Sequence, residues 1–332
     1  MWRKSSRIVS LNRTALKSVV GHGHYGPAPN HIFRILTFGA LCLLLLGRPA
    51  APASASLGPI TRPASGEPLP VLVLAGQSNM IGWVTNVNDL SLPQRATQAN
   101  VLFYGPDENG SNWGWLVPPT VTHDRFGPEI SLGQNLLQHG PYDLVAQVKY
   151  AASGTNLALD WNPADYGWFY AQMQLRAQAA IQKLQSAYPD RRVFVAGFFW
   201  MQGETDAQNA NMAAAYAANL ERLIAQVRLD FHAPALPVFI GRIRAGQYAY
   251  ATAVRQAQAQ VAAGVPNVRL IDTDGLPLAA DHIHYTSAGN VTLGQAFAQS
   301  YLDWQNSQSY IFLPFVFYSP TFAAHQPLSG LP

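Results

Sequence analysis

The chain has almost no cysteine. Of its 332 residues only Cys42 is a cysteine, and Cys42 lies within an apolar run near the amino terminus. If that run is removed as a leader, no thiol remains, which excludes disulfides and thiolate metal sites from the rest of the protein. Export is compatible with this, because about 250 residues in one domain bury enough surface to fold without crosslinks.

Acidic residues are absent from residues 1–55, which hold seven of the 21 Lys and Arg residues. A basic region (1–31), an apolar stretch (32–47) and the small residues Ala53-Ser54-Ala55 follow each other in the order of a secretory signal. The uninterrupted part of the apolar stretch is shorter than the ~20 residues that a transmembrane helix needs. We therefore expect a cleaved leader over 1–55 and a secreted protein; an uncleaved amino-terminal anchor is the alternative.

The leader also accounts for the basic isoelectric point of about 9.0. Without residues 1–55 the chain has 14 basic and 18 acidic residues and a formal charge of −4. Since a basic stripe with interleaved aromatic residues is also lacking, we expect no nucleic-acid partner. Beyond export or anchoring through the leader, the sequence indicates no membrane partner, and it leaves the oligomeric state open.

After a linker rich in Pro, Ser and Gly (56–69), apolar runs alternate with amphipathic segments. Continuous apolar runs of this length are typical of buried parallel strands, and apolar residues spaced by three and four are typical of helices. The predicted strands are 71–75, 101–104, 144–151, 192–200, 237–241 and 268–272, and the predicted helices are 168–188, 212–231, 251–264 and 287–304. The alternation predicts an α/β fold, a three-layer α/β/α sandwich around a parallel sheet, over 70–305. The apolar segment 306–332 lies outside this pattern, and its role is not indicated.

A polar cluster, Gly76-Gln77-Ser78-Asn79, ends the first predicted strand. Ligands bind at the carboxyl ends of the strands in open α/β sheets, so Ser78 is either a turn residue or a nucleophile.

A second segment, "DHIH" (281–284), pairs an acid with an imidazole. Asp281 and His284 are three residues apart, so on a helical turn they would share one side. Asp281 could then accept the ring N–H of His284 and leave the other nitrogen free as a base. Capping of the next helix is the structural alternative, and metal binding is disfavoured because the mature chain has no thiolate and no other cluster of histidines.

Two further segments follow strands. In "WMQGETD", Gln202 is either an amide donor to an oxyanion or a buried amide that ties loops together. Glu204 and Asp206 are either braces for this edge or an acid/base pair for glycoside hydrolysis, and we favour bracing. In "SGTN", Gly154 would let a backbone N–H approach a ligand closely.

Taken together, "GQSNM", "SGTN", "WMQGETD", "DHIH" and "FGPEISLGQNL" (126–136) resemble the sialate O-acetylesterase-like branch of the SGNH hydrolase superfamily, close to the acetylxylan esterases of carbohydrate esterase family six. The resemblance covers roughly 70–305. It implies a flavodoxin-like sandwich with Ser78 as nucleophile, His284 as base and Asp281 as its orienting acid. It also implies an oxyanion hole formed by the N–H groups of Ser78 and Gly154 and by the amide of Gln202.

The leading hypothesis is thus a secreted carboxylic ester hydrolase that removes O-acetyl groups from carbohydrate through an acyl-enzyme, without a metal or other cofactor. Gln77, Asn79, Glu204 and Asp206 would support the site. A short-acyl or lipid esterase of the same fold and a non-catalytic carbohydrate-binding protein are the alternatives. Five tryptophans could stack on sugar rings or pack in the core: Trp83, Trp113, Trp115, Trp161 and Trp168.

Overall fold

The structure is a computed structural model that describes residues 66–104, 112–165 and 167–311. The predictions for the leader (1–55), for most of the linker and for residues 312–332 lie outside the described residues. In the described part, a seven-stranded sheet has the order β3-β2-β4-β1-β5-β6-β7. All neighbours pair in parallel except β3, which is antiparallel to β2. The strands are β1 (Leu69–Gly76), β2 (Gln98–Tyr104), β3 (Gly114–Leu116), β4 (Val145–Ala151), β5 (Val193–Met201), β6 (Val238–Gly241) and β7 (Val268–Ile271).

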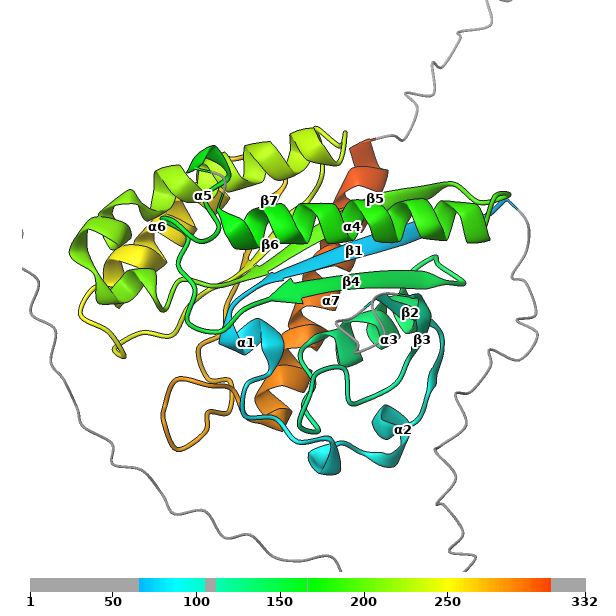
Figure 1. The fold of residues 1–332 in the computed structure, drawn as a ribbon, viewed down its shortest axis with the longest axis horizontal. Helices are drawn as coiled ribbons and strands as arrows, with labels where there is room; N and C mark the ends of the chain where they lie inside the picture. Colours follow the sequence, from blue (N-terminus) through cyan, green and yellow to red (C-terminus); the bar gives the residue numbers. More distant parts are fainter. Residues whose placement is uncertain (1–65, 105–111, 166, 312–332) are drawn as a thin grey trace, which may run out of the picture. The chain divides into compact units, whose positions relative to one another are not determined.

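Helices cover both faces of this sheet, which gives the predicted three layers (Figure 1). On one face lie α4, α5 and α6. α4 leads from β4 past β1 to β5, α5 leads from β5 to β6, and α6 leads from β6 to β7, so all three connections run in the same direction across the sheet. On the other face α3 packs against α7. The helices are α1 (Ser78–Ile81), α2 (Leu92–Arg95), α3 (Glu129–His139), α4 (Trp168–Ala187), α5 (Ala210–Asp230), α6 (Ala251–Gly264) and α7 (Ser287–Ile311).

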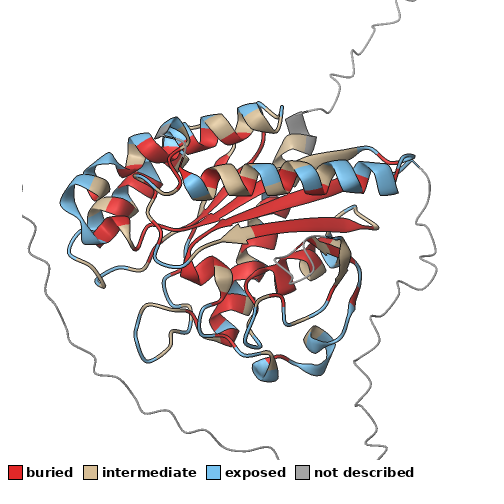
Figure 2. Cartoon of the chain, in the orientation of Figure 1, coloured by how far each residue is buried: buried red, intermediate tan, exposed pale blue. Residues whose placement is uncertain are grey.

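The apolar runs of the sequence form the buried middle layer (Figure 2). Every residue of β1 is buried, and so are the last six residues of β5. Because both faces of these strands are covered, the strands show a continuous apolar run and not an alternation of apolar and polar residues. The six predicted strands are therefore confirmed, as is the fold class.

The structure contains short elements that were not predicted, among them α1 and β3, and one helix that is longer than predicted. β3 was not predicted, because its three residues are too short to show a pattern. The last helix, predicted to end at Trp304, continues to Ile311. α6 ends at Gly264, as predicted, and the N–H of Val265 caps the helix by donating to the carbonyl of Val261.

Three central strands end at the same level of the sheet. Gly76, the last residue of β1, pairs with Ala151 of β4 and with Met201 of β5, and both are the last residues of their strands. From β1 the chain continues to β2 on one side of the sheet, and from β4 it continues to β5 on the other side. Open α/β sheets bind ligands at the point where two neighbouring strands diverge in this way. The segments that carry Ser78, Gly154 and Gln202 therefore leave the sheet side by side.

A buried ion pair fastens β4 to α3 beneath this edge. Lys149 Nζ lies 2.6 Å from Glu129 Oε1, and both side chains are almost completely buried. The same oxygen accepts the N–H of Gly127 at 2.9 Å. Burial lowers the pKa of Lys149 more than the Glu129 carboxylate raises it. The pair fixes the "FGPE" segment against the strand, close to the carbonyl of Met80 in α1.

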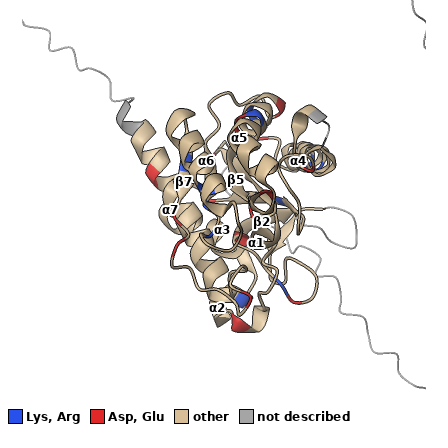
Figure 3. Ribbon diagram, turned by 90° about the vertical axis from the view of Figure 1, so that its left-hand side faces the viewer, with Lys and Arg blue, Asp and Glu red and all other residues tan. Residues whose placement is uncertain are grey.

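Charged residues are few and mixed in sign. Figure 3 shows basic and acidic residues dispersed over several elements. One group of opposite charges lies beyond β6 and β7, where Arg242 pairs with Asp272 and Asp274, and Arg255 pairs with Asp274. Among the described residues, no helix is both long and apolar enough to cross a membrane.

Candidate active site

Ser78 stands on a tight turn between β1 and α1. Gly76 has a φ of +146°, and a side-chain carbon there would lie 2.1 Å from the carbonyl oxygen of Met201. The N–H of Gln77 donates to that same carbonyl at 2.9 Å. Because only glycine tolerates both this dihedral and this approach, the chain leaves β1 pressed against the end of β5 and enters α1 at Ser78.

The residue after Ser78 holds the histidine loop. Asn79 Oδ1 accepts the N–H of Tyr285 at 3.0 Å, and Asn79 Nδ2 donates to the carbonyl of Ile283 at 3.2 Å. Ile283 and Tyr285 flank His284 in the sequence. A single buried amide therefore fixes the backbone of His284 beside the turn that carries Ser78, although the two segments are about 200 residues apart.

Asp281 and His284 form the expected pair through a turn and not through a helix. Asp281 Oδ2 lies 2.6 Å from His284 Nδ1, and Asp281 Oδ1 accepts the N–H groups of Ile283 and His284 at 2.9 and 3.0 Å. Burial raises the pKa of Asp281, but the backbone N–H and ring of His284 and the N–H of Ile283 outweigh it and lower the pKa to about 2. The carboxylate is charged at neutral pH and holds the imidazole by Nδ1, which leaves Nε2 for chemistry.

The hydrogen bond that would complete a Ser–His–Asp triad is not formed in the described part of this structure. Within the described part of the chain, the hydroxyl of Ser78 forms no hydrogen bond with the ring of His284. Such catalytic hydrogen bonds often tighten only when substrate is bound. The structure thus brings the three segments together, and the catalytic roles of Ser78, His284 and Asp281 stay predictions.

Gln202 does not occupy an oxyanion-facing position. Its Nε2 donates to the carbonyl of Thr155 at 2.9 Å and to Asp206 Oδ2 at 2.6 Å, and its side chain is completely buried. Its Oε1 lies 3.2 Å from the hydroxyl of Tyr216. Since the Thr155 carbonyl can only accept, the amide cannot be flipped, and both N–H groups are used. The prediction of Gln202 as an oxyanion donor is corrected on this geometry: the amide ties loops together.

Glu204 and Asp206 brace the edge, as favoured from the sequence. Glu204 Oε1 accepts from Asn79 Nδ2 at 2.8 Å, so Glu204 supports the amide that holds the histidine loop. Asp206 accepts the N–H groups of Leu157 and Ala158. Burial raises the pKa of both acids, and hydrogen bonds oppose the shift. The two acids are nearly inaccessible and bind different partners, which argues against a glycoside-cleaving pair.

Two backbone donors remain available at this edge. Among the described residues, the N–H groups of Ser78 and Gly154 donate to no protein acceptor. Gly154 lies in an exposed turn after β4, with no atom within 4 Å of the position of a side chain. Gln77 supports the same region, because its Oε1 lies 3.4 Å from the N–H of Gly203.

The sequence did not indicate several partners of this site. The backbone of 157–158 and the hydroxyl of Tyr216 had no motif to mark them, because their role depends on which loops meet in space. The tryptophans separate clearly by exposure. Trp161 is completely buried, Trp113 and Trp115 pack against the core, and Trp83 and Trp168 are 40% and 65% exposed.

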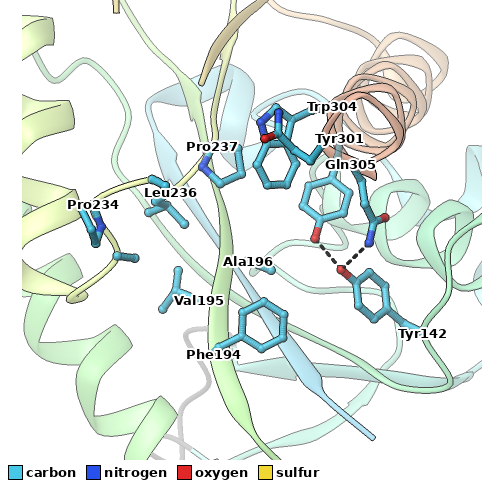
Figure 4. Close-up of a pocket in the computed structure, with 13 residues that line it drawn as sticks. Tyr142, Phe194, Val195, Ala196, Pro234, Leu236, Pro237, Tyr301, Trp304 and Gln305 are labelled. Atoms are coloured by element: carbon cyan, nitrogen blue, oxygen red, sulfur yellow. Dashed lines mark hydrogen bonds between the residues drawn. The ribbon is translucent and has the colours of Figure 1, made fainter. Parts of the chain in front are cut away.

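A separate apolar groove lies at the opposite end of the sheet (Figure 4). It has a volume of about 700 Å³ and lies between the start of β5, the segment before β6 and the last turns of α7. Tyr142, Tyr301 and Gln305 form its polar end. The groove is lined by no nucleophile or acid/base pair and belongs to the amino ends of the strands, so it is not part of the candidate active site. In the described ranges, no cluster of three His, Cys, Asp or Glu residues could hold a metal ion.

A parallel α/β sandwich that carries a serine at a strand exit and an Asp–His pair at the same edge is the arrangement of a serine ester hydrolase. Residues 68–303 match the family described as "Carbohydrate esterase, sialic acid-specific acetylesterase". The chain belongs to this family and is a carbohydrate acetylesterase by class. The resemblance found in the sequence is thereby confirmed.

Individual relatives agree with this assignment. A probable carbohydrate esterase of Arabidopsis thaliana is 37% identical over 264 residues, which are 73% of this chain and 94% of the relative. An X-ray structure of an Arabidopsis thaliana protein superposes with a TM-score of 0.61 at 25% identity and covers 71% of this chain and 98% of its own. The crystal structure of NanS superposes with a TM-score of 0.57 at 16% identity, over 74% of this chain and 99% of its own, which shows a shared fold.

Proposed function

We propose that this protein is a secreted enzyme that removes O-acetyl groups from carbohydrates through an acyl-enzyme on Ser78. The observation that carries the proposal is the Asn79 clamp: the residue next to Ser78 binds the backbone on both sides of His284. That clamp joins the strand exit to a histidine that Asp281 already holds by Nδ1.

These positions support the following chemistry. Ser78 Oγ attacks the ester carbonyl carbon while His284 Nε2 takes the hydroxyl proton. The tetrahedral intermediate collapses, and the sugar oxygen leaves with the proton from the imidazolium. A water molecule then attacks the acetyl–Ser78 ester as His284 takes its proton. The imidazolium returns this proton to Ser78 Oγ when the bond to the acetyl carbon breaks, and acetate leaves. Throughout, the Asp281 carboxylate stabilises the transient imidazolium.

The negative oxygen of the intermediate is stabilised by backbone donors in this proposal. Within the part of the chain that the structure describes, the N–H groups of Ser78 and Gly154 have no protein acceptor at this edge. Preorganised donors of this kind contribute more in a partly dehydrated site than in water. Gln202 takes no direct part, and contributes by holding the carbonyl of Thr155, the residue after Gly154.

The substrate follows from the family. Its description names a sialic acid-specific acetylesterase, and a curated relative is described as a probable carbohydrate esterase. We propose an acetylated carbohydrate as substrate, and a cleaved leader over 1–55 that exports the enzyme to meet it.

The test is acetate release from a panel of acetylated sialic acid, acetylated xylan and simple aryl esters, with wild type and Ser78→Ala. We expect acetate from at least one carbohydrate, and loss of at least ~10³-fold in the variant, because removal of a nucleophile leaves only binding and oxyanion stabilisation. A fluorophosphonate probe should label wild type and not the variant. Activity on aryl or lipid esters alone would favour a general esterase, and a folded protein that is neither labelled nor active would favour a binding protein.

A further inference from the structure

Trp83, which is exposed, and Arg125, which is half-buried, form a stacked pair close in sequence to Ser78. The guanidinium carbon of Arg125 lies 4.5 Å from the centre of the Trp83 ring, and Trp83 is 40% exposed. The N–H of Trp83 donates to the carbonyl of Ser78 at 3.1 Å. The aromatic ring is therefore attached to the short segment that presents the predicted nucleophile.

The backbone around this pair is firmly fixed. Gly82 has a φ of +86°, and a side-chain carbon there would lie 1.7 Å from the carbonyl oxygen of Phe126. Thr85 Oγ1 lies 2.7 Å from that carbonyl and accepts the N–H of Phe126 at 2.9 Å. Gly82 and Thr85 flank Trp83, and both contact Phe126, the residue after Arg125. The two segments are therefore fixed to each other before a ligand binds, so binding would cost little further ordering.

Neither the indole of Trp83 nor the guanidinium of Arg125 has a structural role that the described residues reveal. Trp83 is outside the apolar core, and within the described residues Arg125 has no carboxylate or carbonyl acceptor for its guanidinium N–H groups. Stacking on Arg125 orients the indole and leaves the rest of the ring in contact with solvent. An exposed tryptophan with unused, charged donors beside it offers a flat apolar surface and hydrogen bonds at its edge.

We propose that Trp83 and Arg125 bind the sugar ring next to the one that carries the acetyl ester. The C–H face of the sugar stacks on the indole, and the guanidinium donates to its hydroxyl oxygens. This inference rests on the proposed function, because it names the residues that bind a second sugar ring of the same substrate. Trp168 is even more exposed, but within the described residues no hydrogen bond or ring contact joins it to α1, so we do not assign it this role.

The test compares Trp83→Ala with wild type on an acetylated oligosaccharide and on an aryl acetate, which has no second sugar ring. We expect kcat/KM for the oligosaccharide to fall about tenfold through KM, and kcat/KM for the aryl acetate to stay within about twofold, because a lost stacking contact is worth about a factor of ten. Trp83→Phe should lower kcat/KM for the oligosaccharide less than Trp83→Ala does, because a phenyl ring keeps part of the stacking surface. Arg125→Ala should also lower this kcat/KM less than Trp83→Ala does. Trp168→Ala is the matched control and should behave as wild type on both substrates.

Equal losses on both substrates, or no loss on the oligosaccharide, would overturn the inference while the proposed function stands. If wild type released acetate from no carbohydrate but hydrolysed the aryl ester, the proposed function itself would fail, and the inference with it. Thermal unfolding of each variant separates these outcomes from misfolding.

Discussion

At the scale of single residues, the site depends on side chains that fix backbone. Asn79 and Asp281 each bind main-chain N–H groups around His284, so the imidazole is positioned from both ends of its loop. Amide and carboxylate groups of this length bind nearby backbone readily, which is why Asn and Asp are common in turns. The orientation of the base is therefore determined before any substrate arrives.

The charge of Asp281 gives a prediction about pH. Its pKa is lowered to about 2, so its pairing stabilises the folded protein above about pH 4 and is lost as the pH falls towards 2. We expect Asp281 itself to contribute no titration to kcat/KM between pH 4 and 7, because its carboxylate stays charged over that range. Asp281→Asn should lower kcat roughly 10⁴-fold without unfolding the protein, because it favours the wrong tautomer of His284. An Asp281 carboxyl carbon that titrates near pH 4 to 5 in the NMR spectrum of the wild type would contradict the assignment.

Gln202 gives a prediction about stability. Gln202→Ala leaves the Thr155 carbonyl without its donor and takes one donor from the buried Asp206. We expect the free energy of unfolding, measured with urea, to fall by about 1–3 kcal/mol. Gln208→Ala, at an exposed position nearby, should change it by less than about 0.5 kcal/mol. An unchanged stability together with a loss of 10²–10³ in kcat would restore the oxyanion role that the sequence suggested.

These residues show what a sequence can and cannot indicate. The pairing of Asp281 with His284 was predictable because three residues separate them, although a turn and not a helix brings them together. The true partners of Gln202 were not predictable, because Thr155 lies 47 positions away and the choice between two acceptors depends on how loops pack. The spacing of residues in a sequence can indicate contacts between near neighbours, whereas hydrogen bonds between distant residues become visible only in the structure.

At the scale of elements, the sheet could be read from the sequence because its strands are buried on both faces. β1 and β5 show continuous apolar runs, and the structure places each within two residues of its predicted range. β3 escaped prediction because it is short and lies at the edge of the sheet, where one hydrogen-bonding side has no partner strand among the described residues. α1 escaped too, since a four-residue helix has no periodicity to detect.

The exit of β1 gives a prediction at this scale. Gly76→Ala would place a methyl group against the Met201 carbonyl in a backbone conformation that side chains avoid. We expect a loss of at least about 1–3 kcal/mol in the free energy of unfolding, and a fall in activity because Ser78 shifts. Gly264→Ala is the matched control: it lies at the exposed end of α6 with no atom within 4 Å, and should stabilise the protein by about 0.5–1 kcal/mol. Equal effects of the two changes would show that the close approach is not a constraint.

At the scale of the whole molecule, the charge of the chain depends on its first 55 residues. They contribute seven positive charges and no negative ones, whereas the remaining chain is acidic. The described domain has its basic residues dispersed and partly paired with acids, as the Arg242 and Arg255 cluster shows. Net charge of this kind concerns solubility and association and not the fold, so the proposed cleavage after Ala55 would change those two properties.

Removal of the leader therefore predicts a change that can be measured directly. Protein recovered from the medium of an expressing culture should begin at Ser56 on amino-terminal sequencing, because Ala53-Ser54-Ala55 has the small residues that a signal peptidase accepts. It should focus below pH 7, since its formal charge is −4, whereas the intact chain should focus near pH 9. Ala53→Arg combined with Ala55→Arg blocks the cleavage positions and should leave an uncleaved, membrane-associated chain, while the same change at Ala50 and Ala51 should still permit cleavage after Ala55. Protein that is found in the medium with residues 1–55 still attached would contradict the leader, and wild type that stays in the membrane fraction would establish the anchor in its place.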